Sequence, residues 1–345
     1  MTILVTGAPG WLGSRLVERL VADGRPVRCL VERDRQDAAL ARLGVERVQG
    51  DLRDPAAAQR ACAGVDAVLH CAGIVHPQRF SDYRAIHVDG TRHLLEAAEH
   101  AGARRFCYVS SEAAQGYNRD GRPLTETDPC HPETEYGRTK RDAELATLDR
   151  NRPGGLETVV LRPAMFYGPG QPERRSRLMR MVASGRPPLF GSGENRRSMV
   201  YVDNVVDALV AASTRAGIGG ELFWIADSEI YTTRGFFEAM AEALGVRLRP
   251  RQLPEALALG ARLASRALER VHVHSLDLHV VGESPRDFFC SNAKALATLG
   301  WAPAVSLREG VRAAVEWWRA HQPGAGRSAA LGAEPRQVRE PTRAP

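Results

Sequence analysis

The stretch LVTGAPGWLGSRLVERL, residues 4–20, places three glycines between a β-branched run and an amphipathic helical pattern. Gly7, Gly10 and Gly13 permit a tight turn, close approach of the backbone to a diphosphate, and contact between helix and sheet. A helix that starts at Trp11 and Leu12 offers free N–H groups and a partial positive charge to an anion. The stretch therefore predicts a dinucleotide-binding turn in which these five residues contact the cofactor.

Strand-like runs and helical patterns alternate through the first half of the chain. The strand-like runs lie at residues 2–6, 27–31, 47–51, 67–73, 104–111 and 158–163. The helical patterns between them lie at residues 11–22, 36–43, 56–63, 83–101 and 133–149. This alternation predicts right-handed crossovers and a parallel sheet covered on both faces. The expected fold class is α/β, a Rossmann-type doubly wound parallel sheet.

The regular alternation of strand-like runs and helical patterns ends after Pro163. Gly-, Pro- and Arg-rich stretches follow, and then helical patterns at 203–213, 233–244, 254–270 and 306–320. We expect residues 1–165, with about 199–226 returning to the sheet, to form the dinucleotide domain. Residues 166–198 and 227–321 would form a smaller, mainly helical substrate lobe over the carboxyl edge of the sheet. Residues 322–345 are rich in Pro, Gly, Ala and Arg without periodicity, which predicts a disordered tail.

Composition narrows the class of protein. The chain has 43% hydrophobic and 26% charged residues, and no apolar run approaches the ~18 residues of a membrane span. The start MTILVTGAPG lacks the basic segment of a secretory signal, so a cytoplasmic location is expected. The net charge of +6 is dispersed, which suits an anionic small molecule better than nucleic acid. The six cysteines show no metal-binding or disulfide spacing.

Glu32 follows the second strand-like run, 19 residues after Gly13. A carboxylate there accepts hydrogen bonds from the ribose hydroxyls of a dinucleotide and repels a 2′-phosphate, which favours NAD. Arg33 and Arg35 lie beside it and could instead clamp a 2′-phosphate. NADP therefore remains an alternative to NAD.

Tyr136 and Lys140 form the expected acid/base pair. Of the 47 Lys and Arg residues 45 are arginine, and Lys140 is one of two lysines. A spacing of four places both side chains on one helix face, where an ammonium stabilises the phenolate and lowers its pKa from the usual ~10. Lysine also reaches ribose hydroxyls, which the larger arginine fork does not. Ser110 and Ser111 end the fifth strand-like run and are candidate donors to the reacting oxygen.

Several motifs together resemble one family, the extended short-chain dehydrogenases/reductases. The relatives within it include nucleotide-sugar epimerases and dehydratases and 3β-hydroxysteroid dehydrogenases. The resemblance spans roughly residues 2–320 and rests on the motifs TGAPGWLG, GDLRD, HCAG, YVSS, YGRTK, LRPAMFYGPG, GSGENRRSMVYVDNVVDAL and LGWAP.

The resemblance assigns further roles by position. Asp51 and Leu52 would contact adenine, Ala72 and Gly73 would line the cofactor, and Pro163 would lie near the nicotinamide amide. Ser111 rather than Ser110 matches the catalytic Ser/Thr, since it lies five residues before Gly116. Arg197 resembles the arginine that holds substrate phosphate, with a solvated loop charge as its alternative. The resemblance also implies a homodimer through the helices near 83–101 and 134–149.

Two positions depart from the family pattern. His87 stands where the family usually has asparagine, and it would either relay protons or pack in the interior. In dehydratases of the family an Asp-Glu pair follows the catalytic residue, whereas Ser111 is followed by Glu112 and Ala113. A single carboxylate does not readily supply both the acid and the base for loss of water, so a dehydratase is disfavoured. Glu112, Tyr167 and Arg197 are the expected substrate-binding residues.

The helical pattern at 254–270 has an apolar stripe, formed by Leu257, Gly260, Ala264, Ala267 and Leu268. We expect this stripe to pack onto the domain, with a membrane-surface helix as the alternative.

The sequence thus predicts an NAD(P)-dependent enzyme that moves a hydride to or from a secondary alcohol or ketone carbon. The expected substrate is a nucleotide-linked or other polar sugar, handled by dehydrogenation, keto reduction or epimerisation. A sterol-like or polyketide alcohol is the second expectation. A lyase that uses Glu112 and a non-catalytic dinucleotide-binding regulator are the remaining alternatives.

Overall fold

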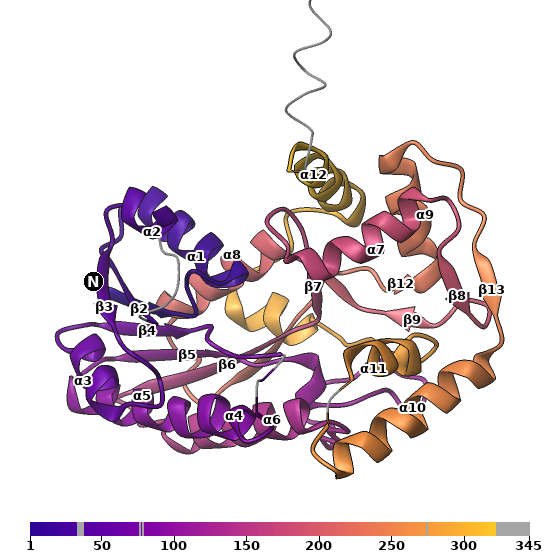
Figure 1. The fold of residues 1–345 in the computed structure, drawn as a ribbon. Coiled ribbons are helices and arrows are strands. Elements are labelled where there is room, and N and C mark those ends of the chain that lie inside the picture. Colours follow the sequence, from indigo (N-terminus) through magenta and orange to yellow (C-terminus); the bar gives the residue numbers. More distant parts are fainter. Residues whose placement is uncertain (33–37, 76, 78, 274, 322–345) are drawn as a thin grey trace, which may run out of the picture.

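The computed structural model describes residues 1–32, 38–75, 77, 79–273 and 275–321. Its central element is a seven-stranded sheet (Figure 1). Each neighbouring pair of strands in this sheet is parallel. The strands run in the order β11 (Leu222–Ile225), β6 (Glu157–Pro163), β5 (Arg105–Val109), β4 (Ala67–His70), β1 (Ile3–Thr6), β2 (Val27–Val31) and β3 (Glu46–Gln49). Because the chain moves outward from β1 in both directions, the doubly wound α/β fold is confirmed.

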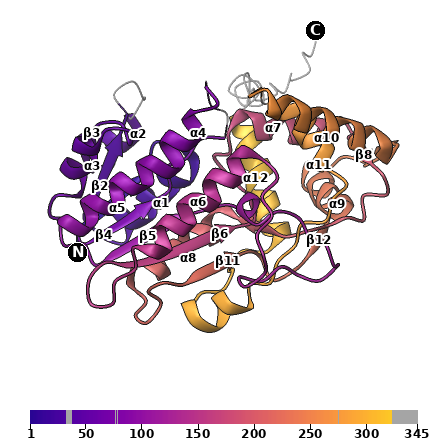
Figure 2. The same ribbon diagram turned by 90° about the horizontal axis from the view of Figure 1, so that it is seen from below.

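Helices cover both faces of the sheet, as the two views show (Figures 1 and 2). One face packs against α1 (Trp11–Ala22), α8 (Val202–Thr214) and the short α2 (Ala38–Arg42). The other face packs against α3 (Pro55–Cys62), α5 (Gly90–His100) and α6 (Glu135–Asp149). The expected helix at 83–101 is divided into α4 (Asp82–Arg84), a π-helical turn η1 (Ala85–Asp89) and α5.

A second hydrophobic cluster forms the core of the smaller lobe. It joins α7 (Glu173–Ala183), α9 (Thr233–Leu244) and α12 (Leu307–Ala320) to β7 (Met165–Tyr167) and β10 (Met199–Tyr201). The lobe also contains two short two-stranded sheets. In one, β9 (Arg196–Arg197) pairs with β12 (Tyr231–Thr232), and in the other β8 (Pro188–Phe190) pairs with β13 (Arg251–Leu253). At the rim of the lobe α10 (Glu255–Arg270) packs against α11 (Leu276–Glu283). The remaining helical turns are η2 (Glu112–Ala114) and η3 (Ala295–Leu299).

Local signals explain where several helices begin. Thr134 caps α6 by accepting a hydrogen bond from the N–H of Gly137 at 3.1 Å. Ser306 and Glu309 form a reciprocal capping box at the start of α12. In the part of the chain that the structure describes, no helix is both long and apolar enough to cross a bilayer.

The structure corrects the expected packing of one lobe helix. The apolar stripe of α10 was expected to face the domain, but Leu257, Gly260, Ala264 and Ala267 are exposed and Leu268 is half-buried. The side that packs instead contains Ala258 and Ser265. The reason is that α10 is covered by α11 on only one side, and small residues on that side allow the two helices to approach closely. The predicted tail at 322–345, with Arg33 and Arg35, lies outside the described residues.

Candidate active site

The turn between β1 and α1 has no room for side chains at its three glycines. Gly7 has φ +87°, and a Cβ there would lie 2.7 Å from the backbone nitrogen of Ala72. A Cβ on Gly10 or on Gly13 would lie 2.5 Å or 2.6 Å from the carbonyl oxygen of Gly7. Because Gly10 has no side chain to cap the helix, the first N–H groups of α1 remain directed at the space before it. This cradle of backbone N–H groups fits a diphosphate.

Trp11 connects this turn to the smaller lobe. Its indole Nε1 donates a hydrogen bond to the carbonyl of Pro169 at 2.7 Å. The centre of its ring lies 4.9 Å from the ring centre of Phe166. Leu12 is buried in the core. The side chains of Trp11 and Leu12 are thus used in packing, which leaves their backbone N–H groups as the atoms that face an anion.

The residues expected around adenosine follow the next two strands of the sheet. Glu32 is exposed directly after β2. Asp51 follows β3 and is paired with Arg53, whose backbone N–H donates to it at 2.8 Å. The hydrogen bonds from Arg53 hold the pKa of the Asp51 carboxyl below its usual value. The carbonyl of Leu52 lies 3.0 Å from Nδ1 of His93 on α5.

Lys140 is buried at the carboxyl edge of the sheet. Its Nζ donates to the carbonyl of Val109 at 2.7 Å and lies 4.3 Å from the ring centre of Tyr108. A Cβ placed on Gly73 would be 3.8 Å from the same nitrogen. Burial lowers the pKa of Lys140 to about 7, and the charge of Glu144 partly opposes this shift. Lys140 therefore lies beside the segment that was expected to line the cofactor.

Tyr136 lies one turn before Lys140 on α6, and its ring packs edge-on against two neighbours. The ring centres lie 5.4 Å from His87 and 6.1 Å from Tyr83. Across from α6, Ser111 ends the segment after β5, and its Oγ accepts a hydrogen bond from the N–H of Ala113 at 3.3 Å. An oxygen that accepts this bond can still donate its proton. The Oγ of Ser110 is buried without a hydrogen-bond partner among the described residues.

His87 is held on both sides of its ring. Its Nε2 accepts a hydrogen bond from the N–H of Ile74 at 3.0 Å, so its Nδ1 carries the proton and donates to Oγ1 of Thr139 at 2.9 Å. Burial, with a contribution from Lys140, lowers the pKa of His87 to about 2. A neutral ring with both nitrogens bonded matches the packing alternative, because it ties η1 to α6 beside Tyr136.

His70 is a site residue that the sequence did not reveal. Its Nδ1 lies 2.6 Å from Oγ1 of Thr6 and its Nε2 lies 3.0 Å from Oγ1 of Thr91, which donates to the carbonyl of His87. Burial lowers the pKa of His70 to about 3. This neutral chain connects the end of β1 to the helix that carries His87. A histidine at the end of a buried strand in the motif HCAG was the signal that could have found it.

A buried ion pair lies beneath α6, the helix that carries Tyr136 and Lys140. Glu144 on α6 and Arg162 on β6 are both fully buried, and Nε of Arg162 lies 2.6 Å from Oε1 of Glu144. Arg162 also donates to Gln115. Pro163, expected near the nicotinamide, follows Arg162 and ends β6 beside Ile225 of β11. The ion pair fixes α6 against the sheet one turn after Lys140.

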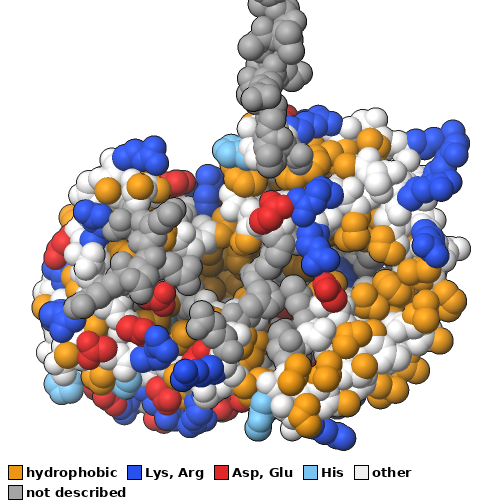
Figure 3. Space-filling model, viewed as in Figure 1, with side chains coloured by type: hydrophobic (Ala, Val, Ile, Leu, Met, Phe, Trp, Pro, Cys, Tyr) orange, Lys and Arg blue, Asp and Glu red, His pale blue; other side chains and the backbone are white. Residues whose placement is uncertain are grey.

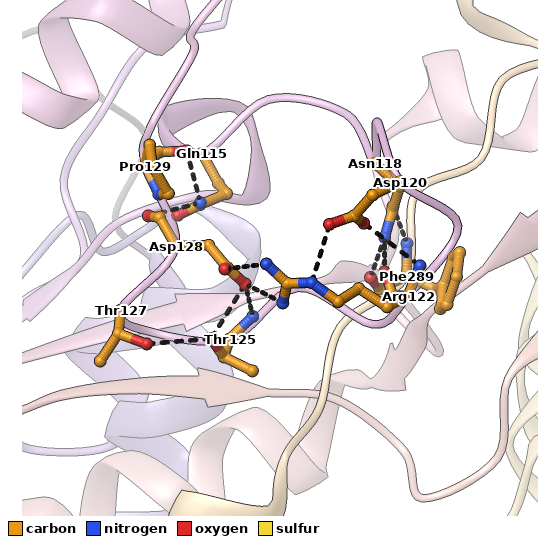
Figure 4. Close-up of polar contacts among 9 residues, drawn as sticks. All are labelled: Gln115, Asn118, Asp120, Arg122, Thr125, Thr127, Asp128, Pro129 and Phe289. Atoms are coloured by element: carbon orange, nitrogen blue, oxygen red, sulfur yellow. Dashed lines mark hydrogen bonds and ion pairs between the residues drawn. The ribbon is translucent and has the colours of Figure 1, made fainter.

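The loop between η2 and α6 is fixed by its own polar contacts (Figure 4). Arg122 pairs with Asp128 and with Asp120, and the bonds from Arg122 hold the pKa of Asp128 well below its usual value. Nε2 of Gln115 donates to the carbonyls of Asp128 and Pro129 at 3.0 and 3.1 Å. The loop thereby holds Gln115 in place to accept the hydrogen bond from Arg162.

The three expected substrate residues have separate partners. Oε2 of Glu112 accepts from the N–H of Met165 at 3.0 Å. The hydroxyl of Tyr167 donates to Asp227 at 3.4 Å, and burial raises the pKa of that carboxyl to about 7. The guanidinium of Arg197 donates to the carbonyls of residues 283 and 284 at 2.8 and 3.1 Å. Arg197 is therefore not a solvated loop charge.

Figure 3 shows a hollow with hydrophobic side chains between the sheet domain and the lobe. Among the described residues, no group of three or more His, Cys, Asp and Glu side chains is arranged to hold a metal ion.

Comparison with known proteins defines the class. The model of the NAD dependent epimerase/dehydratase family matches residues 3–226, and the chain belongs to this family. This agrees with the resemblance to extended short-chain dehydrogenases/reductases that the motifs indicated. Family membership makes the chain an enzyme of the NAD-dependent oxidoreductase type.

Individual relatives differ in what they act on. Sterol demethylase protein B of Methylococcus capsulatus is 33% identical over 92% of this chain and 98% of its own length. UDP-glucose 4-epimerase of Mycolicibacterium smegmatis is 30% identical over 92% of this chain and 99% of its own length. Among solved structures, MoeE5 in complex with UDP-glucuronic acid and NAD has 26% identity and a TM-score of 0.72, covering 92% of this chain and 99% of that chain.

Proposed function

We propose that the protein is an NAD(P)-dependent oxidoreductase that transfers a hydride to or from a secondary alcohol or ketone carbon. One observation carries the proposal. Lys140 is buried one helical turn after Tyr136, beside Gly73, at the sheet edge that also holds the glycine turn. Burial opposes the charge of Lys140, so a lysine kept at this place beside a tyrosine and the glycine turn favours a functional role.

The cofactor would lie across the carboxyl edge of the sheet. Backbone N–H groups at Trp11 and Leu12 would hold its diphosphate beside Gly10, whose own N–H donates to the Gly7 carbonyl at 2.8 Å. Glu32 would hold its adenosine ribose, and Asp51 with Leu52 its adenine. Gly7 and Gly13 supply the space, while Ala72, Gly73 and Pro163 would line the nicotinamide half. When bound, the cofactor supplies a hydride acceptor or donor at nicotinamide C4. Exposed Glu32 favours NAD over NADP because a carboxylate repels a 2′-phosphate.

Side chains of the protein would transfer the proton that accompanies the hydride and would orient the substrate oxygen. The hydroxyl of Tyr136 would exchange a proton with the substrate oxygen, and Ser111 would orient that oxygen by donating its hydroxyl proton. The Lys140 ammonium would hold ribose hydroxyls and stabilise the charged form of Tyr136. His87 and the Glu144–Arg162 pair would position α6 without touching the substrate.

For the substrate, a nucleotide-linked or other polar sugar is supported by MoeE5, which was solved with UDP-glucuronic acid, and by the UDP-glucose 4-epimerase relative. A lipophilic alcohol is the second candidate. It is favoured by the bonds of Arg197 to backbone carbonyls, which occupy the side chain expected to hold a phosphate. It is also favoured by the relative named as a sterol demethylase protein. A dehydratase is disfavoured because Glu112 is a single carboxylate and already accepts the Met165 N–H.

The Tyr136→Phe variant tests the catalytic assignment. We expect turnover to fall by about 10²–10⁴-fold while NAD affinity changes by only a few-fold, because the variant removes the proton carrier alone. Cofactor reduction during turnover and calorimetric titration of NAD measure the two quantities. Tyr108→Phe is the matched control, since its buried hydroxyl has no hydrogen-bond partner among the described residues. Wild-type turnover in Tyr136→Phe would exclude the proposed role of Tyr136. A wild-type protein that binds NAD but turns over no substrate would instead indicate a dinucleotide-binding regulator.

A screen of ligands separates the two substrate classes. Native mass spectrometry of the purified protein identifies bound dinucleotide and any pocket ligand. Turnover is then compared for UDP-sugars and for hydroxysteroids, with NAD and NADP in parallel. An epimerase would return its cofactor unchanged, whereas a dehydrogenase or reductase would not.

A further inference from the structure

The α10 helix turns an apolar surface to solvent. At 100° per residue, seven apolar positions and Arg270 lie within about half of the helix circumference, and all eight are exposed. We call this surface the α10 apolar face, formed by Ala256, Leu257, Leu259, Gly260, Leu263, Ala264 and Ala267. Leu257, Leu259 and Leu263 are 55%, 47% and 58% exposed. Exposed apolar surfaces of this kind usually mark an interaction site.

Basic side chains lie at both ends of this face. Arg247, Arg249 and Arg251 precede α10, and Arg270 ends it; all four are exposed. In the described part of the chain none of these four arginines forms an ion pair. The acidic residues near them in sequence are Glu242, Glu255 and Glu269, of which Glu242 pairs with Arg308 and Glu269 with Arg138. Figure 3 shows hydrophobic side chains gathered over this side of the lobe, with Lys and Arg side chains next to them.

We propose that the α10 apolar face binds the surface of a membrane that contains anionic lipids. An interfacial helix buries its apolar face at the boundary of headgroups and acyl chains and keeps its polar face in the protein or in water. Arginines close to an anionic surface strengthen binding by electrostatic attraction to the headgroups. The charge of this region is therefore complementary to anionic headgroups. At 16 residues α10 is too short to cross a bilayer, so it would lie in the plane of the interface.

Contacts at the end of α10 place this face beside the candidate active site. Arg266 pairs with Glu133, which precedes α6, and Glu269 lies 3.8 Å from Arg138 on α6. The ring of His272, in the turn after α10, lies 5.0 Å from the ring of Phe80. A docked α10 would thus hold the start of the Tyr136 helix close to the lipid surface. This position suits a lipophilic substrate that reaches the site from the membrane. The link to such a substrate rests on the proposed function, but the proposal that α10 binds membranes does not rest on it.

Co-sedimentation with vesicles tests the proposal. The full chain is mixed with vesicles of phosphatidylcholine alone or of phosphatidylcholine with phosphatidylglycerol. We expect binding to the mixed vesicles, weaker binding to phosphatidylcholine alone, and loss of binding at high salt. The double variant Leu259→Gln/Leu263→Gln should bind at least about tenfold more weakly, because two leucines no longer enter the interface. Leu296→Gln, at a leucine 40% exposed on η3, is the matched control and should bind as the wild type does.

Each other outcome would overturn the proposal. Wild-type protein that stays in solution with both kinds of vesicle would exclude it, as would equal binding by the double variant. If light scattering showed that the double variant splits a wild-type assembly, the face would instead bind a second copy of the chain. Tyr136→Phe should bind vesicles normally, so failure of the catalytic proposal and failure of this one are distinguishable.

Discussion

Lys140 is one of two lysines in a chain that otherwise uses arginine, and its surroundings give the reason. Its Nζ lies between the Val109 carbonyl and the Tyr108 ring, where a compact ammonium fits. A planar guanidinium needs more room and more acceptors than this site provides. With its pKa lowered to about 7 by burial, Lys140 can also be neutral near physiological pH until a partner or ligand stabilises its charge.

The His87→Asn variant is expected to make folding stability less dependent on pH. Folded His87 has a pKa of about 2, below its usual 6.5, so stability is present above about pH 6.5 and is lost as the pH falls. Removing the imidazole removes one proton of uptake, and the slope should decrease by up to about 1.4 kcal/mol per pH unit below that pH. Urea unfolding at a series of pH values measures it. A slope equal to that of the wild type would mean that His87 is already charged in the folded protein.

Residue type and short spacing were sufficient to predict that Tyr136 and Lys140 share a helix and that the three glycines form a tight turn after β1, while their catalytic and cofactor-binding roles stay predictions. They were not sufficient for His70, because Thr91, which binds it, is 21 residues away. The partners of Arg197 are 86 and 87 residues away, so its bonds to backbone carbonyls had no local signal. Side-chain roles that depend on distant partners become visible only in the folded chain. The roles assigned to Ser111, Glu32 and the other site residues remain predictions.

At the scale of elements, the β1–α1 turn depends on the absence of a side chain at Gly13. In Gly13→Ala the new Cβ would lie 2.6 Å from the Gly7 carbonyl, so the turn must shift. We expect a loss of about 1–3 kcal/mol in the free energy of unfolding, together with weaker NAD binding. Chemical denaturation and calorimetry measure these two effects.

Gly260→Ala is the matched control for that substitution. Gly260 also lies within a helix, but a Cβ there has no heavy atom within 4 Å among the described residues. Alanine should therefore stabilise α10 by up to about 1 kcal/mol. If both variants were equally stable, the close packing of the glycine turn would not limit what residue can stand there.

Helices and strands with clear periodicity were predicted within one or two residues at most ends, as for β2 at 27–31 and α9 at 233–244. The sequence did not indicate α7 or α11. Five arginines and several Gly and Pro residues around 168–187 concealed the helical pattern of α7, and α11 is only eight residues long. The π-helical turn η1 was also not predicted, because it arises where His87 bonds to both Ile74 and Thr139.

At the scale of the whole molecule, a homodimer through α5 and α6 remains a prediction. Leu145 on α6 is 49% exposed and lies in a shallow groove with Val88, Arg92 and Asp142. We expect light scattering to give twice the chain mass of 37.7 kDa. Leu145→Glu should shift this mass toward a single chain, because a charge would be buried at the interface. Leu296→Glu is the control at an exposed leucine elsewhere, and a wild-type mass of one chain would contradict the prediction.

The doubly wound sheet was predicted correctly from the sequence, because its strands alternate with helices along the chain. The outward face of α10 was predicted incorrectly. A helical stripe shows that a helix is amphipathic, but it does not show which side meets the rest of the protein. That side was decided by α11, whose Gly282 approaches the backbone of Arg262 closely.

The bond from Trp11 to the Pro169 carbonyl joins segments 158 residues apart. During translation, the glycine turn after β1 emerges from the ribosome long before Pro169, which accepts the hydrogen bond from Trp11. Strand β1 likewise needs β4 on one side and β2 on the other. A nascent chain shorter than about 170 residues therefore has the glycines of the nucleotide cradle without the indole anchor. The contacts that complete the glycine turn can therefore form only in the second half of synthesis. Until then the incomplete sheet is exposed to chaperones.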